Sequence, residues 1–493
     1  MSADHRLPES LEGISIHLVG AKGTGMAALA EILSARGAML SGSDVPDTFY
    51  TDAILKAIGV KMSLGFDASH LPSNAKLVVY SAAYSRENNP ELLEAARRGL
   101  PVINYPEALG ALSRRSDSSG IAGVHGKTTT TALAGSVISA LGLPATILAG
   151  SAVSSFGGRS TMIRGERYFI AETCEYRRHF LSFRPSRIVL TSIESDHQDF
   201  YPTYGDIYAA FLDFLRLLPP NGELIYCADD AGASAAARDI AKERQDIAQT
   251  PYGEAAEGPY RLVSYAAGEG AARFRLAGLD AEFTLHMPGR HIALDASAAL
   301  ALAFSILNRE RFAGNSLNPT PGPADIAAAR EALALFAGSK RRSEILGEVG
   351  GILFMDDYGH HPTAIRETIR GVREFWPQRR LVVDFMSHTY SRTKALFDDF
   401  AASLDGADAL VMHGIYASAR ETPDPSVSGR MLFDAVGLRA SSRPRYYFES
   451  VLDGLDELES SLKPGDLFLT MGAGDNWKLG EALYERIKRG ERQ

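Results

Sequence analysis

The sequence predicts an α/β protein of three domains, in which helices cover both faces of mostly parallel sheets. Short runs of apolar and β-branched residues alternate with longer amphipathic stretches along the whole chain, which is typical of doubly wound sheets. The runs are almost continuously apolar, as in parallel strands that are buried on both faces. The chain of 493 residues is also longer than one hydrophobic core usually serves, so two to four domains are expected.

The strands expected from these runs divide the chain into three blocks. They are segments 14–20, 76–82, 167–173, 187–193, 223–227, 352–358, 380–386, 409–415 and 466–472. The polar segment 113–120 is expected to be a linker before the second block, and 336–344 leads into the third set of strands. We therefore expect domains at 1–115, 116–335 and 336–493. Such sheets bind ligands at the carboxyl ends of their strands, so residues that directly follow a strand are the best candidates for a site.

The composition narrows the class of function. Apolar residues make up 45% and charged residues 23%, as in soluble globular proteins, and no run of about 18 apolar residues predicts insertion into a membrane. The formal charge of −9 argues against nucleic acid as a partner. Two cysteines, Cys174 and Cys227, cannot form a disulfide framework and fit a reducing compartment. The polar N-terminus lacks the apolar core of a secretory signal, so a cytoplasmic location is expected.

A glycine-rich turn follows the first expected strand, in LVGAKGTGMAALAEIL. The spacing of Gly20, Gly23 and Gly25 differs from the dinucleotide pattern G-x-G-x-x-G, so nicotinamide binding is not supported. Bare backbone at a helix N-terminus nevertheless suits a diphosphate. Asp44 lies at about the distance downstream at which such folds place a ribose-binding carboxylate. A tight turn without a ligand explains this segment equally well.

A second turn, GIAGVHGKTTTT, carries a shorter form of a phosphate-binding loop. Isoleucine replaces the first glycine of the pattern G-x-x-x-x-G-K-[ST]. Gly123 and Gly126 would let the backbone approach a phosphate, Lys127 offers a positive charge, and the Thr128 hydroxyl can join a magnesium shell. The alternative is an ordinary helix start, but four consecutive threonines are poor helix formers, so phosphate binding is favoured.

Two later segments could complete a magnesium site with Thr128. Glu172 and His197 both follow strand-like runs, so both could reach the edge of the sheet that carries the loop. Magnesium prefers oxygen ligands, and His197 would act through water. The alternative is a surface charge pair between Glu172 and Arg177 or Arg178.

The segments DDYGHHPT and SHTYSRT place polar and ring-bearing groups after two further strands. The adjacent histidines His360 and His361 resemble a metal site, yet neighbouring side chains rarely bind one ion. Orienting a substrate or capping the next helix is favoured. Arg392 is suited to binding a carboxylate or phosphate with its planar guanidinium.

Together these segments resemble the Mur ligase family, the ATP-dependent enzymes that add amino acids to the peptidoglycan precursor. The second turn is similar to the family's phosphate signature G-[TV]-x-G-K-[ST]-T, and KRR-x-E, DDYGHHPT, H-x-Y-S-R-T and MGAGD follow in family order between residues 18 and 475. The resemblance implies a Rossmann-like UDP-binding domain, a central P-loop-type ATPase domain and a C-terminal Rossmann-like domain that closes on ATP and the amino acid.

The resemblance also implies roles for individual residues. The UDP-substrate group is Gly23, Thr24, Gly25, Met26, Asp44, Ser81 and His125. The ATP group is Gly123, Gly126, Lys127, Thr128, Thr129, His291, Asp295, Arg342 and Asp357. The amino-acid group is His360, His388 and Arg392, and the Mg²⁺ group is Thr128, Glu172 and His197. The implied catalytic residues are Lys127, His197 and Arg342.

The implied reaction joins L-alanine to UDP-N-acetylmuramate through an acyl phosphate formed with ATP. Two anions meet in such a transfer, so the cations Lys127, Arg342 and Mg²⁺ would neutralise them. An acyl phosphate is hydrolysed in open water, so the third domain is expected to close over it, with a hinge near 330–340.

Some positions depart from the family pattern and keep alternatives open. The family motif G-x-H-N-x-x-N appears as GRHIALD, so Ile292 and Asp295 replace both asparagines and leave the adenine contact open. One alternative is a ligase that attaches a recycled peptide, and another is a non-catalytic UDP-sugar-binding protein. The sequence also leaves open glycine or L-serine as the amino acid, and a monomer or a homodimer as the assembly.

Overall fold

The computed structural model describes residues 7–268, 270–312, 321–417, 421–439 and 442–490. The chain divides into two compact units. The first comprises Met1–Ile193, Tyr208–Tyr260 and Ala298–Ala329, and the second comprises Glu194–Ile207, Arg261–Ser297 and Arg330–Gln493. Each unit is an α/β structure, as the sequence predicts.

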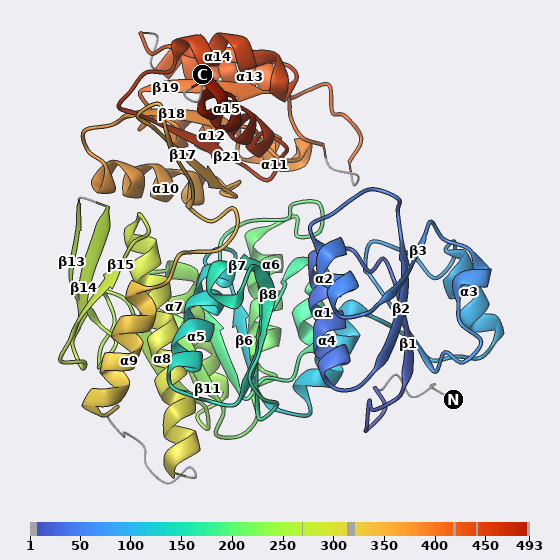
Figure 1. The fold of residues 1–493 in the computed structure, drawn as a ribbon. Helices are drawn as coiled ribbons and strands as arrows, with labels where there is room; N and C mark the ends of the chain where they lie inside the picture. Colours follow the sequence, from blue (N-terminus) through green and yellow to red (C-terminus); the bar gives the residue numbers. More distant parts are fainter. Residues whose placement is uncertain (1–6, 269, 313–320, 418–420, 440–441, 491–493) are drawn as a thin grey trace. The chain divides into compact units, whose positions relative to one another are not determined.

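A five-stranded parallel sheet forms the N-terminal part of the first unit, with strand order β3-β2-β1-β4-β5. Its strands are β1 (Ser15–Val19), β2 (Met39–Asp44), β3 (Lys61–Leu64), β4 (Leu77–Tyr80) and β5 (Val102–Asn104). Its helices are α1 (Thr24–Ala35), α2 (Thr51–Ala57), α3 (Pro90–Arg97) and α4 (Tyr105–Ser113), with a 3₁₀ turn at Ala68–His70. Figure 1 shows α1 and α4 on one face of this sheet and α3 on the other. The central strand β1 is fully buried, so the loop after it lies at the middle of the sheet's carboxyl edge.

A seven-stranded sheet forms the rest of the first unit, with order β12-β11-β10-β6-β9-β7-β8. Its strands are β6 (Asp117–Ala122), β7 (Ala145–Val153), β8 (Arg159–Ile163), β9 (Tyr168–Glu172), β10 (Arg187–Leu190), β11 (Glu223–Cys227) and β12 (Ala248–Tyr252). The helices along this part of the chain are α5 (Lys127–Ala140), α6 (Tyr204–Leu215), α7 (Ala231–Glu243), α8 (Arg290–Phe312) and α9 (Pro323–Ala334). The edge strand β8 runs antiparallel to β7, and the other pairs are parallel.

The prediction of a linker at 113–120 was wrong, because strand β6 begins within this segment. This strand lies in the middle of the sheet, between β10 and β9, and Ser118 and Ser119 are fully buried. The Ser118 hydroxyl donates to the carbonyl of Ser113 at 2.7 Å, so its burial is compensated. Gly120 packs closely, since a β-carbon there would lie 3.1 Å from the Phe214 ring. Strand β6 was not predicted, because its first residues are small and polar and the strands were sought as apolar runs.

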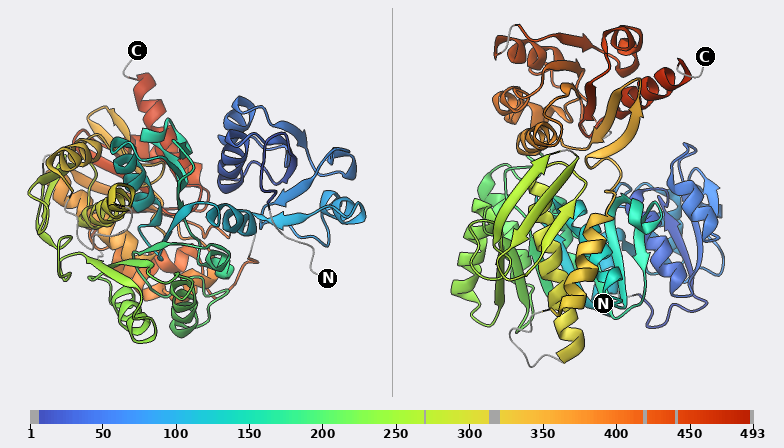
Figure 2. Two further views of the ribbon diagram at one scale, coloured as in Figure 1. Left: turned by 90° about the horizontal axis from the view of Figure 1, so that it is seen from below. Right: turned by 60° about the vertical axis from the view of Figure 1, so that its left-hand side comes forward.

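The second unit holds a six-stranded sheet, with order β16-β17-β21-β18-β19-β20. Its strands are β16 (Glu344–Val349), β17 (Ile352–Asp357), β18 (Arg380–Phe385), β19 (Ala409–His413), β20 (Arg445–Phe448) and β21 (Asp466–Met471). Its helices are α10 (Pro362–Phe375), α11 (Tyr390–Ala395), α12 (Phe397–Ser403), α13 (Gly429–Arg439), α14 (Leu455–Ser461) and α15 (Trp477–Gly490). A small antiparallel sheet, β13 (Leu262–Gly268), β14 (Ala271–Leu276) and β15 (Glu282–Leu285), appears in yellow-green in Figure 2.

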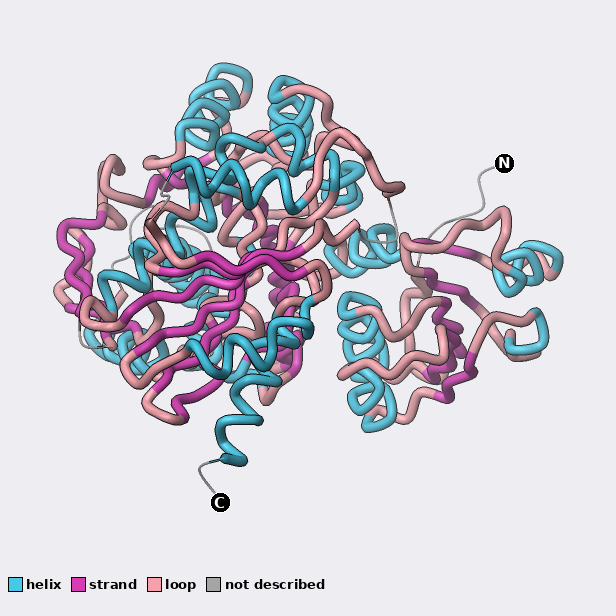
Figure 3. Tube along the Cα trace, turned by 90° about the horizontal axis from the view of Figure 1, so that it is seen from above, coloured by secondary structure: helices cyan, strands magenta, loops and turns pink. Residues whose placement is uncertain are grey.

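Helices lie on both faces of the six-stranded sheet (Figure 3). Alternate residues of one strand therefore enter two separate cores: Leu381 and Val383 join one cluster, and Val382 joins the other. This arrangement explains why the strand sequences are almost continuously apolar. All nine strands expected from apolar runs are present.

One helix in the described part of the chain, at Arg290–Arg311, is long and apolar enough to cross a membrane by length and composition. Within its most apolar window, however, 78% of the residues are buried inside the protein. The core helices of soluble proteins show the same pattern, so this helix is weak evidence for a membrane span.

Candidate active site

The glycine-rich turn joins β1 to α1 at the carboxyl edge of the N-terminal sheet. Gly20 has φ +76°, and a β-carbon there would overlap the ring of Tyr84, so only glycine fits. Asp44, the last residue of β2, accepts from the Lys22 amide at 2.6 Å and from the Tyr84 hydroxyl at 3.2 Å. Burial and the Asp44 carboxylate raise the pKa of Tyr84 to about 12. The carboxylate thus anchors the turn.

The structure brings most of the predicted UDP-binding residues to this edge. Gly23 precedes α1, which begins at Thr24, and Gly25 packs against Tyr105, where a β-carbon would lie 2.8 Å from the ring. The Ser81 amide donates to the Val19 carbonyl at 2.9 Å, which places the end of β4 beside the end of β1. Met26 is buried in the first turn of α1. His125 lies instead in the second turn.

The second turn joins β6 to α5 and uses both of its glycines. Gly123 has φ +144° and Gly126 has φ +77°, conformations that favour glycine. Two contacts hold the turn against the segment after β10: the His125 amide donates to the Ser192 hydroxyl at 2.9 Å, and the Val124 amide donates to the Ser192 carbonyl at 3.1 Å. Lys127, Thr128 and Thr129 are the first residues of α5, so backbone amides are presented at a helix N-terminus, as a phosphate site requires.

Lys127 is held in this turn by a carboxylate that the sequence argument did not single out. Its ammonium donates to Glu175 Oε2 at 2.9 Å and to the Gly123 carbonyl. Burial lowers the pKa of Lys127, but the carboxylates of Glu175 and Glu172 outweigh burial and raise it above its ordinary value. Lys127 is therefore charged at neutral pH, and a phosphate would have to compete with Glu175 for it.

Thr128 and Glu172 meet as the magnesium hypothesis requires. The Thr128 hydroxyl donates to Glu172 Oε2 at 2.7 Å. A β-carbon at Gly150 would overlap the Glu172 carboxylate, so glycine keeps that side open. A hydroxyl and a carboxylate are hard oxygen ligands, which fit Mg²⁺. In the alternative pairing, Arg177 and Arg178 would bind Glu172, whereas Arg178 pairs with Asp213 and Arg177 lies over the Tyr176 ring.

A cavity of about 140 Å³ connects these features within the first unit. Its walls include Gly25 from the first turn, Tyr105 from α4, and Gly150 and Glu172 near the second turn. The cavity therefore joins the start of α1 to Glu172.

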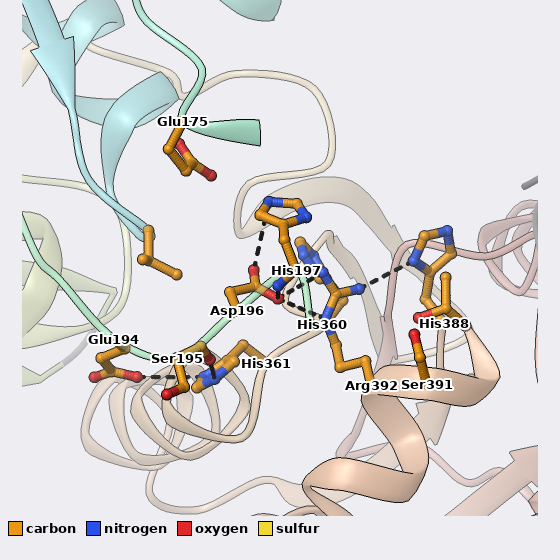
Figure 4. A network of polar contacts seen from close by, with 12 residues as sticks. Glu175, Glu194, Ser195, Asp196, His197, His360, His361, His388, Ser391 and Arg392 are labelled. Carbon is orange, nitrogen blue, oxygen red and sulfur yellow. Dashed lines mark hydrogen bonds and ion pairs between the residues drawn. The ribbon is translucent and has the colours of Figure 1, made fainter. Parts of the chain in front are cut away.

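The second unit contains a buried cluster around Arg392, which Figure 4 shows. The guanidinium contacts Asp196 Oδ1 through Nε at 2.9 Å and through Nη2 at 2.8 Å. Its Nη1 donates to His388 Nδ1 at 3.1 Å. Burial raises the pKa of Asp196, but Arg392 and His197 outweigh burial and hold it well below its usual range. Sequence reasoning missed Asp196, although it directly precedes His197 after an expected strand.

His360 also faces this cluster (Figure 4). Its ring centre lies 6.2 Å from that of His388, and its Nδ1 lies 3.0 Å from the carbonyl oxygen of Tyr358. Because a carbonyl only accepts, Nδ1 carries a proton and Nε2 is the basic nitrogen of the neutral ring. Burial and the positive charge of Arg392 lower the pKa of His360 well below its ordinary value, so the ring is neutral at neutral pH.

His197 and His388 complete the group around Asp196. The His197 amide donates to Asp196 Oδ1 at 2.7 Å. His197 has φ +55°, which is uncommon for a residue other than glycine. His388 stacks on Tyr416, with ring centres 5.8 Å apart. The predicted amino-acid residues His360, His388 and Arg392 therefore do lie together.

The two histidines of DDYGHHPT have different environments. His361 is the N-cap of α10 and accepts from the Thr363 amide, which matches the predicted capping role. Its Nε2 also lies 3.2 Å from the Ser195 carbonyl oxygen. Orientation of a substrate, the alternative to capping, stays a prediction for His360.

The arginines of KRR share the ring of Tyr358, with the Arg341 guanidinium 5.2 Å and the Arg342 guanidinium 4.9 Å from the ring centre. Arg341 Nε also pairs with Asp356 at 2.8 Å. Asp357 accepts from the amides of Ser343 at 2.7 Å and Gly359 at 2.6 Å. Burial raises the pKa of Asp357 although Arg342 opposes the shift.

The predicted adenine contacts begin α8. His291 and Asp295 are four residues apart, which places them on the same face of this helix. Asp295 is buried.

Three family models match the chain in order. "Mur ligase family, catalytic domain" matches residues 15–117, "Mur ligase middle domain" matches 121–303, and "Mur ligase, glutamate ligase domain" matches 341–474.

Individual proteins match nearly the whole chain. A Treponema pallidum (strain Nichols) protein named UDP-N-acetylmuramate–L-alanine ligase is 50% identical over 482 residues, which cover 98% of each chain. The crystal structure of UDP-N-acetylmuramate-alanine ligase from Thermotoga maritima is 25% identical with a TM-score of 0.75, covering 97% of this chain and all (100%) of that one. A murein peptide ligase from Psychrobacter arcticus 273-4 shares the fold, with 23% identity and a TM-score of 0.64 over 96% of this chain and 99% of that one. Similarity of this extent, with three family domains matched in sequence order, means that this chain belongs to the Mur ligase family.

Proposed function

We propose that this Mur ligase joins L-alanine to UDP-N-acetylmuramate with ATP, as an acid–amino-acid ligase of peptidoglycan precursor synthesis. The observation that carries this proposal is the 50% identity, over 98% of both chains, to the Treponema pallidum protein of that name. The middle-domain match at residues 121–303 and the phosphate turn around Lys127 support ATP as the co-substrate.

In the first unit, Lys127 would move from Glu175 to the transferred phosphate and neutralise its charge. Thr128 and Glu172 would hold Mg²⁺, which when bound offsets the negative charge of the β- and γ-phosphates. We also assign two residues of the second unit to this chemistry: His197 to the magnesium group through water, and Arg342 to the γ-phosphate. The muramate carboxylate attacks the γ-phosphorus, the bond to the β-phosphate oxygen breaks, and ADP leaves.

In the second unit, Arg392 would bind the carboxylate of L-alanine with its planar fork. The incoming ammonium must lose a proton before it can attack. The neutral His360 offers Nε2 as the acceptor, because its Nδ1 proton is directed to the Tyr358 carbonyl. The amine then forms the amide bond with the acyl carbon, and phosphate leaves with the electron pair of the carbon–oxygen bond.

The remaining features of the proposal concern the whole chain. We place the UDP-substrate, ATP and closing domains at 1–115, 116–335 and 336–493, in agreement with the order of the family matches. We expect the enzyme to be cytoplasmic and to act as a monomer or homodimer.

Phosphate release from ATP tests the function directly. UDP-N-acetylmuramate is supplied with L-alanine, glycine, L-serine or the tripeptide L-Ala-γ-D-Glu-diamino acid, each in a separate reaction. We expect the highest kcat/KM with L-alanine. Preference for the tripeptide would instead support a recycling ligase, and no phosphate release with any acceptor would support a non-catalytic UDP-sugar-binding protein.

A further inference from the structure

A buried lysine organises the loop that follows β2. Lys22 lies in the glycine-rich turn, and its side chain is only 4% exposed. Its ammonium donates to the carbonyls of Val45 at 3.0 Å and Asp47 at 2.7 Å, and it lies 3.4 Å from the Asp52 carboxylate. Segment 45–52, which we call the aromatic loop, is thereby fixed to the turn expected to hold the diphosphate.

Two aromatic side chains of the aromatic loop are exposed beside this turn. Phe49 and Tyr50 are each 44% exposed, although both are large and apolar. The Tyr50 hydroxyl donates to the Thr24 hydroxyl oxygen at 3.0 Å, at the first residue of α1. The Phe49 ring centre lies 5.9 Å from the Lys22 ammonium. Single exposed apolar residues are common, whereas two adjacent exposed aromatic rings, both in contact with the turn expected to hold a diphosphate, form a candidate binding surface.

The geometry of the fold indicates what would lie on these rings. A diphosphate at the start of α1 directs the attached ribose toward the carboxylate at the end of β2, which is Asp44. The base on that ribose would then lie near the residues that follow Asp44. Aromatic side chains bind bases by stacking, and Phe49 and Tyr50 lie within this segment.

We propose that Phe49 and Tyr50 form the platform that stacks on the pyrimidine base of the UDP substrate, and that Lys22 positions the aromatic loop for this contact. The inference rests on the proposed function, because it requires a UDP-linked substrate. It assigns base recognition to side chains outside the glycine-rich turn.

Binding of UDP to the full chain tests the platform. Calorimetry is done with ADP present, so that UDP does not compete for the turn around Lys127. We expect Phe49→Ala and Tyr50→Ala each to weaken UDP binding about tenfold, since stacking is lost. Tyr50→Phe keeps the ring and should change the Kd less than threefold. The control Leu93→Ala removes another exposed apolar side chain (49% exposed), on α3, and should leave the Kd unchanged.

Thermal unfolding of each variant separates a binding effect from a folding effect, and the Tm values should agree with the wild type. If the wild type binds UDP and both alanine variants bind UDP with a Kd within twofold of the wild-type value, the platform is refuted while the proposed function stands. If the wild type itself does not bind UDP, the proposed substrate is wrong and the inference falls with it.

Discussion

Lys127 donates to Glu175 at 2.9 Å, so its ammonium must exchange one anion for another when a phosphate arrives. Removing this charge would leave only Arg342 and Mg²⁺ to offset the negative charge that develops in the proposed phosphoryl transfer. We expect Lys127→Ala to lower kcat by about 10³-fold. The KM for UDP-N-acetylmuramate should stay within a few-fold, because we expect its UDP part to bind at α1. Steady-state phosphate release measures both constants.

The matched control for this prediction is Lys242→Ala. Lys242 is 76% exposed and pairs with Asp239 on the surface of α7. Its loss should leave kcat unchanged. Undiminished turnover in Lys127→Ala would refute the catalytic role.

Asp196 fixes the guanidinium of Arg392, which we propose to bind the carboxylate of L-alanine. The pair is buried, with side chains 4% and 6% exposed, so the guanidinium has little freedom while Asp196 is charged. We expect Asp196→Asn to raise the KM for L-alanine at least tenfold and to change the KM for UDP-N-acetylmuramate little, since truncating a buried charge pair leaves its partner uncompensated. Asp213→Asn, which removes a surface partner of Arg178, is the control. Equal changes in both KM values would contradict a local role.

At the scale of elements, apolar runs predicted nine of the strands that the described residues form, and motifs at strand ends predicted the residues of the candidate site. Glu172 ends β9, whereas Lys127, His360 and Arg392 come shortly after β6, β17 and β18. Parallel strands align their carboxyl ends, which brings such residues to one edge of a sheet. Sequence reasoning failed where tertiary contacts decide the outcome. The strand β6 is made partly of serine, and its burial depends on neighbouring strands.

Three residues near the candidate site were not predicted, for the same physical reason. Glu175, Asp196 and Lys22 each hold a charged group or a backbone carbonyl in place. In each case the partner, such as Arg392 for Asp196, is distant in sequence. Spacing along the chain carries no information on such pairs. Only the folded chain shows which carboxylate meets which cation.

A buried polar network joins three elements of the six-stranded sheet. His413 Nε2, at the end of β19, lies 2.6 Å from Asp384 Oδ1 in β18, and both side chains are fully buried. The Asn476 amide donates to the backbone carbonyls of Asp384 at 3.0 Å and Met471 at 3.1 Å. The network therefore ties together the ends of β18, β19 and β21, from which His388 and the loop after Met471 continue.

The network predicts a pH dependence of stability. Burial lowers the pKa of His413, but Asp384 outweighs burial and raises it above the ordinary value. A raised folded-state pKa gives stabilisation that is fully present below about pH 6.5 and is lost as the pH rises through the folded-state value. We expect His413→Gln to cost about 3 kcal/mol at pH 6 and progressively less toward pH 9. Urea unfolding of both proteins at several pH values measures this, and a constant difference would refute it.

At the scale of the whole molecule, ligation requires an acyl phosphate that water does not reach, so we expect the C-terminal domain to move during the reaction. The predicted hinge at 330–340 contains Gly338, which has φ +84°. A β-carbon disfavours this conformation and would restrict the backbone there. We expect Gly338→Ala to lower kcat about tenfold while the Kd for UDP is unchanged.

The control for the hinge variant is a second glycine with positive φ, which lies outside segment 330–340. Gly142 has φ +68°, and a β-carbon there would meet no heavy atom within 4 Å, so Gly142→Ala imposes similar local strain in the turn after α5. Its effect should be confined to the Tm. Small-angle scattering adds a second measurement of closure. A non-hydrolysable ATP analogue together with UDP-N-acetylmuramate should reduce the radius of gyration of the wild type and of Gly142→Ala. The reduction should be smaller for Gly338→Ala. If both glycine variants lose kcat equally, backbone strain alone explains the loss and the hinge lies elsewhere.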